Sequence, residues 1–310
     1  MPHTDRFHGL LIIDKPAGWT SHDVVGRIRR LLGQRSVGHA GTLDPAATGV
    51  LPVAVGSGLR ALEYLTGETK SYRAEITFGL TTDALDSEGH VTGFCDPPTL
   101  DELQWDAVLQ TFRGPYEQVP PVFSAIKIDG TPLYERARRG ETIEPPKRSV
   151  AVYSLVIQRW EPPVLTVDID CSKGFYVRSF ARDLGVRAGS CGYLSNLVRT
   201  RVGAFDLCDA WRLDELSEAP LAAEWERIAL APDTTALGLP AIILPVERVI
   251  DWEHGKRWPI DDARGSGSVR VYDCAGVWLG IGELAEDGDA TTLRPRKVIP
   301  TLTTHVQEQD

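Results

Sequence analysis

Two kinds of short apolar segment along the chain predict β-strands. In one kind the apolar residues are continuous, as in a strand buried on both faces, and in the other they alternate with polar residues, as in a half-buried strand. These segments are residues 10–14, 50–55, 72–78, 150–157, 165–170 and 197–205. In the last segment we expect the arginine side chains to point outward.

Helical spacing of apolar residues appears between these strands. Ser21 is expected to cap a helix that ends before Gly33, a residue type favoured just past a helix end. Thr99 and Glu102 form a capping-box pattern ahead of a second helix. Residues 176–187 have the apolar face of a third helix. Because strands and helices alternate irregularly, we expect a mixed sheet.

Two segments interrupt this pattern. Residues 119–146 contain Pro-Pro and Asp-Gly pairs and a polar helical stretch, which predict a projecting hairpin and short helix. Residues 231–235 are typical of a linker, and short strands beyond it, such as residues 277–284, predict a small all-β module. We therefore expect two domains, residues 1–230 and 231–310.

Length and charge refine this interpretation. A chain of 310 residues suits two domains at roughly 100–200 residues each. Its net charge of −10 argues weakly against a nucleic-acid partner. However, residues 171–205 carry six basic side chains and one acidic side chain. Such a segment can present a basic face to RNA phosphates, although unrelated solvated faces are an equally simple interpretation.

The cysteines and the apolar runs bear on the cellular compartment. Five cysteines without a Cys-x-x-Cys pair suggest neither a disulfide framework nor a zinc ribbon, so a reducing cytoplasm is expected. The first residues lack an apolar signal region, and the apolar runs are far shorter than the ~18 residues that span a bilayer. We expect neither export nor a membrane partner.

The candidate chemistry is concentrated in one loop, residues 38–49. The sequence has no Walker loop, no GxGxxG after a strand, no GxSxG and no HExxH. The loop holds Asp44, which precedes a proline. Taken alone, an aspartate in that position is most simply a turn residue.

Five ordered motifs change the interpretation of this aspartate, because together they resemble the TruB family of bacterial tRNA pseudouridine-55 synthases. The motifs are residues 9–21 (GLLIIDKPAGWTS), 38–52 (GHAGTLDPAATGVLP), 70–74 (KSYRA), 118–134 (beginning QVPPVFSA) and 171–179 (CSKGFYVRS). Residues 269–282 are similar to the PUA-type RNA-binding domain of the family, with an unrelated small β barrel as the alternative.

The resemblance implies an α+β pseudouridine synthase fold with a mixed, largely antiparallel sheet and flanking helices, followed by a small PUA-like β barrel. Residues 1–230 would form the catalytic domain, with an RNA-clasping insertion at about 119–146, and residues 231–310 would bind RNA. The implied activity is isomerisation of uridine 55 in the T-arm loop of tRNA to pseudouridine, with the base flipped out of its stack. No cofactor and no metal are expected, because the reaction includes neither a redox step nor phosphoryl transfer.

The resemblance also assigns the catalytic residues. Asp44 is the essential carboxylate, and its path stays open among attack on the ribose, addition to the base and removal of a sugar proton. Arg178 is expected to pair with Asp44 through a bidentate ion pair, with a phosphate contact as the alternative. Tyr72 is expected to stack on the flipped uracil, with a core aromatic role as the alternative.

Three further residues are expected to bind the substrate. His39 would contact the rearranged tRNA loop, where an imidazole can stack and donate a hydrogen bond; an ordinary loop histidine is the alternative. Tyr176 and Leu197 would pack against the base, and ordinary core positions are the alternative for both.

Two other functions compete with the isomerase. One is a tRNA-binding folding chaperone with incidental or absent catalysis, and the other is the guide-RNA-dependent pseudouridine synthase subunit. The trio Asp44, Tyr72 and Arg178 favours the enzyme over the chaperone, and the lack of basic tails disfavours the guide-RNA subunit. We expect a tRNA T-arm partner, no required protein partner and a monomer.

Overall fold

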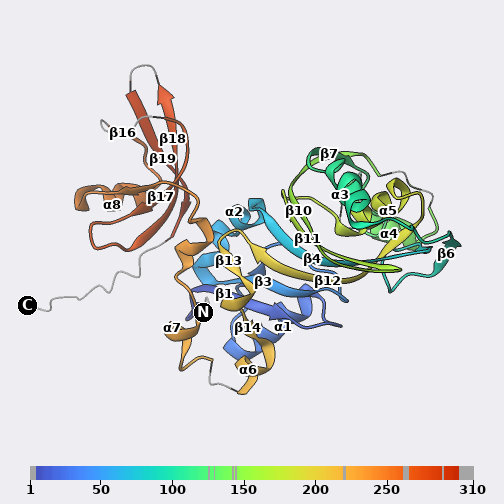
Figure 1. The fold of residues 1–310 in the computed structure, drawn as a ribbon. Helices are drawn as coiled ribbons and strands as arrows, with labels where there is room; N and C mark the ends of the chain where they lie inside the picture. Colours follow the sequence, from blue (N-terminus) through green and yellow to red (C-terminus); the bar gives the residue numbers. More distant parts are fainter. Residues whose placement is uncertain are drawn as a thin grey trace, which may run out of the picture.

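The computed structural model describes residues 5–124, 126–128, 130–141, 143, 145–218, 221–260, 265–287 and 290–299 (Figure 1). Residues 1–4, 219 and 220 of the first predicted domain, four positions inside the predicted insertion 119–146, and residues 261–264, 288, 289 and 300–310 of the second predicted domain therefore lie outside the described residues. Within the described part of the chain, no helix is both long and apolar enough to cross a membrane.

A ten-stranded sheet forms the larger part of the molecule. Its main path runs in the order β14 (Trp211–Arg212), β1 (Gly9–Lys15), β3 (Thr48–Val55), β12 (Gly192–Val202), β4 (Lys70–Phe78), β11 (Val164–Cys171), β10 (Arg148–Glu161) and β7 (Gly114–Gln118), with β2 (Val37–His39) beside β3 and β13 (Phe205–Asp206) beside β12. Among the described strands of this sheet, only the β1–β14 and β3–β12 pairs are parallel. The prediction of a mixed, largely antiparallel sheet is confirmed.

The continuous apolar runs are explained by burial on both faces of the sheet. In β1, Leu11 and Ile13 pack with the helix α1 (Ser21–Leu32), whereas Leu10 and Ile12 pack into a separate cluster on the other face. Each of these side chains is therefore removed from water, and no polar position is needed among them.

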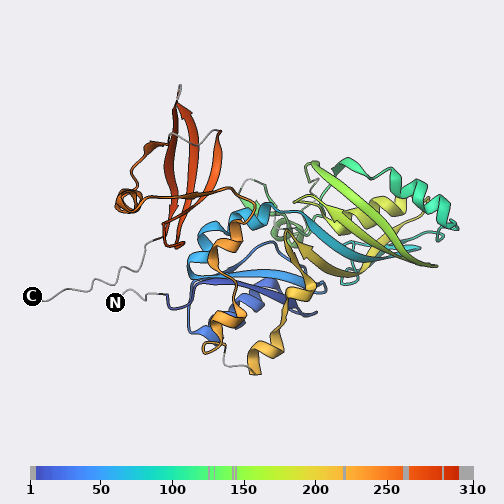
Figure 2. The same cartoon turned by 60° about the vertical axis from the view of Figure 1, so that its left-hand side comes forward.

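The helices α3 (Glu102–Gln110) and α5 (Val177–Arg187) lie side by side on one face of the sheet (Figure 2). Their contact with the strands is apolar: Trp105, Phe180 and Leu184 are completely buried there. This packing fixes α5 against β4 and β12, and so fixes the arginine at the beginning of α5.

Both predicted helix caps need correction. The first helix is capped by Thr20, not Ser21, because the Thr20 hydroxyl accepts from the Asp23 amide while the Asp23 carboxylate accepts from the Thr20 amide. The second is capped by Asp101 with Gln104, not by Thr99 with Glu102. In each case a neighbouring polar residue offers a reciprocal pair that spacing alone could not distinguish.

The predicted orientation of the arginines in residues 197–205 is wrong for Arg199. Its side chain is 1% exposed, whereas Arg201, on the same strand, is half-buried and pairs with Asp170. The reason is the position of β12 at the centre of the sheet, where both faces are covered.

Two short two-stranded pieces are separate from this sheet. Strands β5 (Leu80–Thr82) and β6 (Val91–Phe94) form a separate ribbon. The predicted insertion contains the expected hairpin, β8 (Lys127–Ile128) with β9 (Thr131–Pro132), and the expected short helix, α4 (Leu133–Arg138).

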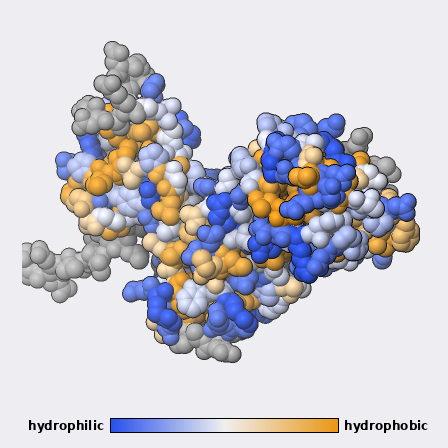
Figure 3. Space-filling model, in the orientation of Figure 1, coloured by the Kyte–Doolittle hydropathy of each residue, from blue (hydrophilic) through white to orange (hydrophobic). Residues whose placement is uncertain are grey.

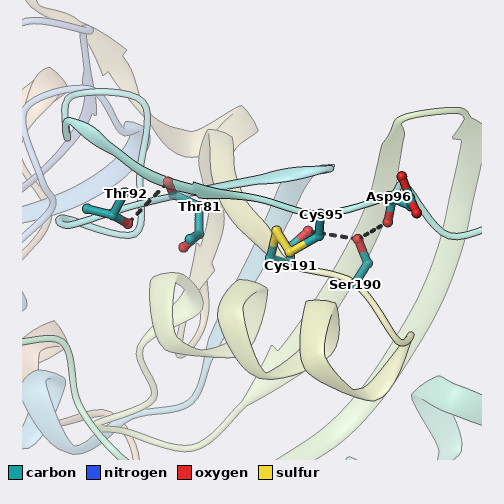
Figure 4. The surroundings of a disulfide bond; sticks show 6 residues. All are labelled: Thr81, Thr92, Cys95, Asp96, Ser190 and Cys191. Atoms are coloured by element: carbon teal, nitrogen blue, oxygen red, sulfur yellow. Dashed lines mark hydrogen bonds between the residues drawn. A yellow bond between two sulfur atoms is a disulfide. The ribbon is translucent and has the colours of Figure 1, made fainter.

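A disulfide joins Cys95 to Cys191, with Cα atoms 5.8 Å apart (Figure 4). It links the end of the β5–β6 ribbon to the turn between α5 and β12, where Ser190 Oγ also donates to the Asp96 carbonyl at 2.7 Å. This corrects the expectation that the cysteines form no pairs. The partners are 96 residues apart in the sequence, so no local spacing rule could reveal them. Cys171, Cys208 and Cys274 are free.

The predicted linker 231–235 is instead a packed 3-10 helix, η3 (Pro232–Ala236). It follows the short helices α6 (Leu213–Glu218) and α7 (Trp225–Ile228), and it contacts η1 (Gly56–Ala61) and α2 (Leu62–Gly67). Thr235 and Ala236 are almost completely buried there. Burial of small residues explains why a segment with linker composition is ordered.

A second, curled five-stranded sheet follows in the order β15 (Ala241–Ile243), β17 (Gly267–Tyr272), β18 (Trp278–Asp287), β19 (Ala290–Val298) and β16 (Trp258–Ile260). Helix α8 (Val246–Glu253) packs on it through Trp252, so the module is not all-β as predicted. The module stands apart from the lobe that carries α3 and α5, with open space between them (Figure 3). Trp278 and Ile281 attach it to Ala61 and Ala236.

Candidate active site

The loop between β2 and β3 is held by hydrogen bonds from several elements. The Leu43 amide donates to Ser21 Oγ at 2.9 Å, at the beginning of α1. On the other side of Asp44, the Pro45 carbonyl accepts from the Gly18 amide at 2.9 Å and from Lys15 Nζ at 3.1 Å. Because its neighbours on both sides are fixed, the loop presents Asp44 in one position.

Asp44 and Arg178 form a bidentate ion pair. Arg178 Nε lies 2.9 Å from Asp44 Oδ2, and Arg178 Nη2 lies 3.1 Å from Asp44 Oδ1. The Arg178 side chain is 8% exposed and the Asp44 side chain 40% exposed. The guanidinium is therefore the fixed partner, and the carboxylate faces open space.

Other oxygen atoms fix the Arg178 guanidinium. Its Nη1 donates to the Ala84 carbonyl at 3.2 Å, and its Nη2 donates to the Phe123 carbonyl at 3.0 Å. Asp86 Oδ2 lies 3.6 Å from Nη1, and burial raises the pKa of Asp86 above its ordinary value. No sequence motif marks Asp86 as a site residue; the only signal is a run of carboxylates in residues 80–98, a segment without Lys or Arg.

A cavity of about 840 Å³ opens beside this ion pair. Five of the six predicted site residues line it: Asp44, Tyr72, Tyr176, Arg178 and Leu197. They come from the β2–β3 loop, from β4, from the beginning of α5 and from β12. Residues far apart in the sequence thus meet at one place.

The aromatic walls of the cavity are neutral at physiological pH. Tyr72 is buried on β4, and burial raises its pKa to about 12. Burial also raises the pKa of Tyr176. The main chain of Tyr176 is fixed by Gln118, whose amide group both accepts from its N–H and donates to its carbonyl. Both rings therefore offer a protonated hydroxyl and an apolar face.

His39 does not line this cavity. It lies in β2, with its ring edge-to-face against His22 at 5.4 Å between centroids. Its Nδ1 is buried and has no hydrogen-bond partner among the described residues. Burial lowers the pKa of His39 to about 4, so the imidazole is neutral at pH 7.

This arrangement suits nucleophilic or general-base chemistry by one carboxylate. Asp44 is oriented by a guanidinium fork, and a planar ring can lie between Tyr72 and the neighbouring apolar side chains. In the described part of the chain, no group of three or more His, Cys, Asp or Glu side chains is arranged to hold a metal ion.

Family models match almost the whole chain. Residues 29–177 match the N-terminal domain of the TruB family pseudouridylate synthases, residues 178–251 match the C-terminal domain of tRNA pseudouridylate synthase B, and residues 240–299 match the C-terminal region of pseudouridine synthase II TruB.

Curated relatives agree with these matches. The tRNA pseudouridine synthase B of Trichormus variabilis is 42% identical over 89% of this chain and 94% of its own length. The enzyme of Gloeobacter violaceus is 42% identical over 95% of this chain and 99% of its own length. The enzyme of Pseudomonas syringae is 38% identical over 94% of this chain and 95% of its own length.

Solved structures share the fold. A chain of an H/ACA RNP bound to a substrate RNA containing 2′-deoxyuridine gives a TM-score of 0.72 at 21% identity, over 94% of this chain and 85% of that one. A chain of a Cbf5-Nop10-Gar1 complex gives a TM-score of 0.72 at 23% identity, over 94% of this chain and 85% of that chain.

Proposed function

The chain belongs to the TruB family of pseudouridine synthases and is an isomerase that modifies tRNA, and we propose that it converts uridine 55 of the T-arm loop to pseudouridine with Asp44 as its essential carboxylate. The observation that carries the proposal is the bidentate Asp44–Arg178 pair at the edge of a cavity lined by Tyr72.

The reaction conserves all atoms of the nucleotide. The bond between ribose C1′ and uracil N1 breaks, the uracil turns, and a bond forms between C1′ and C5; C5 loses a proton and N1 gains one. A carboxylate can take part as a nucleophile or as a base in this sequence. Asp44 is suited to either role because Arg178 orients its two oxygens while one side remains open to the cavity.

The remaining site residues are assigned to binding. In the proposal, Tyr72 stacks on the flipped uracil, Tyr176 and Leu197 contact it from the other walls of the cavity, and Arg178 positions Asp44. His39 lies outside the cavity lining, edge-to-face with His22, and in the proposal its neutral ring contacts the opened RNA loop.

The proposal divides the chain into a catalytic domain, residues 1–230 with an RNA-clasping insertion at about 119–146, and an RNA-binding domain, residues 231–310. The C-terminal domain is of the PUA type. We further propose that the protein acts as a monomer without a protein partner and that tRNA binding spans both domains. The Cys95–Cys191 disulfide removes the cysteine argument for the cytoplasm, and the proposal of that compartment rests instead on tRNA as the substrate.

The test is incubation of the purified protein with an unmodified tRNA transcript, followed by nucleoside mapping of the T-arm loop. Pseudouridine at position 55 is expected, with none in a transcript that carries cytidine at that position or in a reaction with Asp44→Asn protein. Intact tRNA binding without pseudouridine would support the chaperone function instead. Activity that requires an added guide RNA would support the guide-dependent alternative.

A further inference from the structure

Arg199 is a buried cation that the mechanism above does not use. Its side chain is 1% exposed, and among the described residues it has no ion pair with a carboxylate. Burial lowers the pKa of Arg199 below its ordinary value. A buried guanidinium is costly unless its N–H groups find acceptors, so the acceptors indicate what the residue is for.

The acceptors lie at the two ends of the loop that carries Asp44. Arg199 Nε donates to the Val50 carbonyl at 2.7 Å, and Nη2 donates to the Gly41 carbonyl at 3.0 Å. Gly41 precedes Asp44 by three residues, and Val50 follows it by six. One rigid planar group therefore fixes the distance between the entry and the exit of the loop.

The strand register places the same residue beside Tyr72. Arg199 is paired with Gly49 on β3 and with Tyr72 on β4. A Cβ atom at Gly49, whose φ is +100°, would lie 2.2 Å from the Arg199 carbonyl oxygen, so glycine permits the close approach of β3. The positive charge of Arg199 opposes the effect of burial on the pKa of Tyr72.

We propose that Arg199 is a positioning residue that fastens the Asp44 loop and the Tyr72 ring to each other through β12. Its side chain reaches the wall of the cavity beside Tyr72, and its proposed role is to set the separation between the carboxylate and the aromatic face. The proposal rests on the proposed function, because it assumes that Asp44 and Tyr72 act on the flipped base. A lysine could not replace the arginine, since a single ammonium lacks the planar fork that reaches both carbonyls.

The charged surroundings are consistent with this placement. Titratable groups on four strands and the loop interact electrostatically with Arg199 or with Tyr72: Lys15, His39, Asp44, Lys70, Tyr72 and Cys171. Burial lowers the pKa of both Lys15 and Lys70 to about 8, and the Arg199 charge adds to this effect. The charge of Arg199 therefore acts on several titratable groups around the site, including Lys15, Lys70 and Tyr72.

The test compares Arg199→Lys with Arg201→Lys, a matched control on the same strand that contacts Asp170 and Ser71 outside the loop. Steady-state assays give kcat and KM for each variant, and the rates are normalised to the fraction of protein that binds tRNA. We expect Arg199→Lys to lower kcat at least tenfold with KM within threefold, and Arg201→Lys to change both by less than threefold.

A double-mutant cycle with Tyr72→Phe separates positioning from simple destabilisation. If Arg199 acts partly through the Tyr72 hydroxyl, the combined loss is smaller than the product of the single losses. Equal losses in Arg199→Lys and Arg201→Lys, strictly multiplicative effects in the cycle, or a kcat within threefold of wild type would each overturn the proposal.

Two controls keep the result interpretable. If Arg199→Lys does not fold, Arg199→Gln takes its place, because its neutral amide lacks the guanidinium fork that donates to both the Val50 and Gly41 carbonyls; wild-type kcat in that variant would then overturn the proposal. Asp44→Asn is assayed in parallel. Activity in Asp44→Asn refutes the proposed function, whereas its inactivity beside a fully active Arg199→Lys refutes only the role of Arg199.

Discussion

At the scale of single residues, one side chain of the site is held rigidly and its partner is open to the cavity. Arg178 is held by Asp44, by the Ala84 and Phe123 carbonyls and by Asp86, and is almost completely buried. Asp44 keeps one side toward the cavity. A carboxylate that must meet a moving uracil needs this combination of fixed orientation and open access.

Asp44→Asn should abolish turnover while leaving tRNA affinity within a few fold. The amide keeps the shape of the side chain but cannot act as a nucleophile or a base, so we expect the rate to fall by about three orders of magnitude or more. Single-turnover assays and filter binding with the same tRNA check both parts. A near-normal rate would remove Asp44 from the catalytic role.

Arg178→Lys should lower the rate at least about tenfold, equivalent to about 1.4 kcal/mol, although the charge is kept. An ammonium cannot form two parallel bonds to Asp44 and also satisfy the Ala84 and Phe123 carbonyls. Steady-state kinetics measures the loss. A rate within threefold of wild type would favour a phosphate contact as the role of this arginine.

His39 should make the folded state less stable in mild acid. Because burial lowers its native pKa from 6.5 to about 4, the unfolded chain binds more protons than the native protein between these values. Its contribution is complete above pH 6.5 and is lost as the pH falls toward 4. We expect the free energy of unfolding to decrease by about 1–2 kcal/mol over this pH range. The decrease is smaller than the full pKa shift implies, because solvent screens a partly exposed ring.

Urea unfolding at pH 7 and pH 5 tests this prediction. His39→Gln should show a smaller decrease in stability between the two pH values than wild type does. His254→Gln, at an exposed position in the C-terminal module, is the control and should keep the wild-type difference. Identical pH dependence in all three proteins would contradict the assignment to His39.

At the scale of elements, apolar spacing predicts the strands and the three main helices well. The reason is that burial of one face of an element requires apolar residues at the period of that element. It fails where a choice depends on tertiary neighbours. Thr20 rather than Ser21 caps α1, and Arg199 is buried because β12 is central. The Cys95–Cys191 pair and the role of Asp86 depend on contacts between distant segments, which one sequence does not encode locally. The grouping of the site residues came from motif resemblance.

The disulfide should stabilise the fold measurably. Closing a loop between residues 96 apart restricts the unfolded chain, and native disulfides typically contribute about 2–4 kcal/mol. Urea unfolding with and without a dithiol reductant measures this contribution. Cys191→Ser should lower the stability of the oxidised protein and abolish the effect of the reductant, whereas Cys208→Ser, at an exposed free thiol, should do neither. Unchanged stability on reduction would contradict the prediction.

At the scale of the whole molecule, the C-terminal module is attached by packing as well as by the chain. Trp278 and Ile281 bury Ala61 and Ala236, and Tyr272 donates a hydrogen bond of 2.6 Å to Asp233 in η3. The helix η3 therefore belongs physically to the larger sheet and its covering helices, although its sequence is typical of a linker.

Removal of residues 241–310 should weaken tRNA binding without destroying the chemistry, because the cavity residues all precede this segment. The effect should appear mainly in KM, and the salt dependence of binding should fall by about one unit of log slope for each phosphate that the truncated protein no longer neutralises. A cut before η3, removing 231–310, should additionally lower the melting temperature. A folded 1–240 fragment that binds tRNA normally yet is inactive would contradict the division.

The position of β12 also sets when the enzyme becomes active during its synthesis. This strand lies between β3 and β4, which precede it by more than a hundred residues, and it brings Leu197 to the cavity. Until it leaves the ribosome, Asp44 and Tyr72 belong to two sheet fragments with open edges. At about 5–20 residues per second this interval lasts on the order of 10 s. The nascent chain therefore carries its greatest risk of aggregation just before its active site is closed.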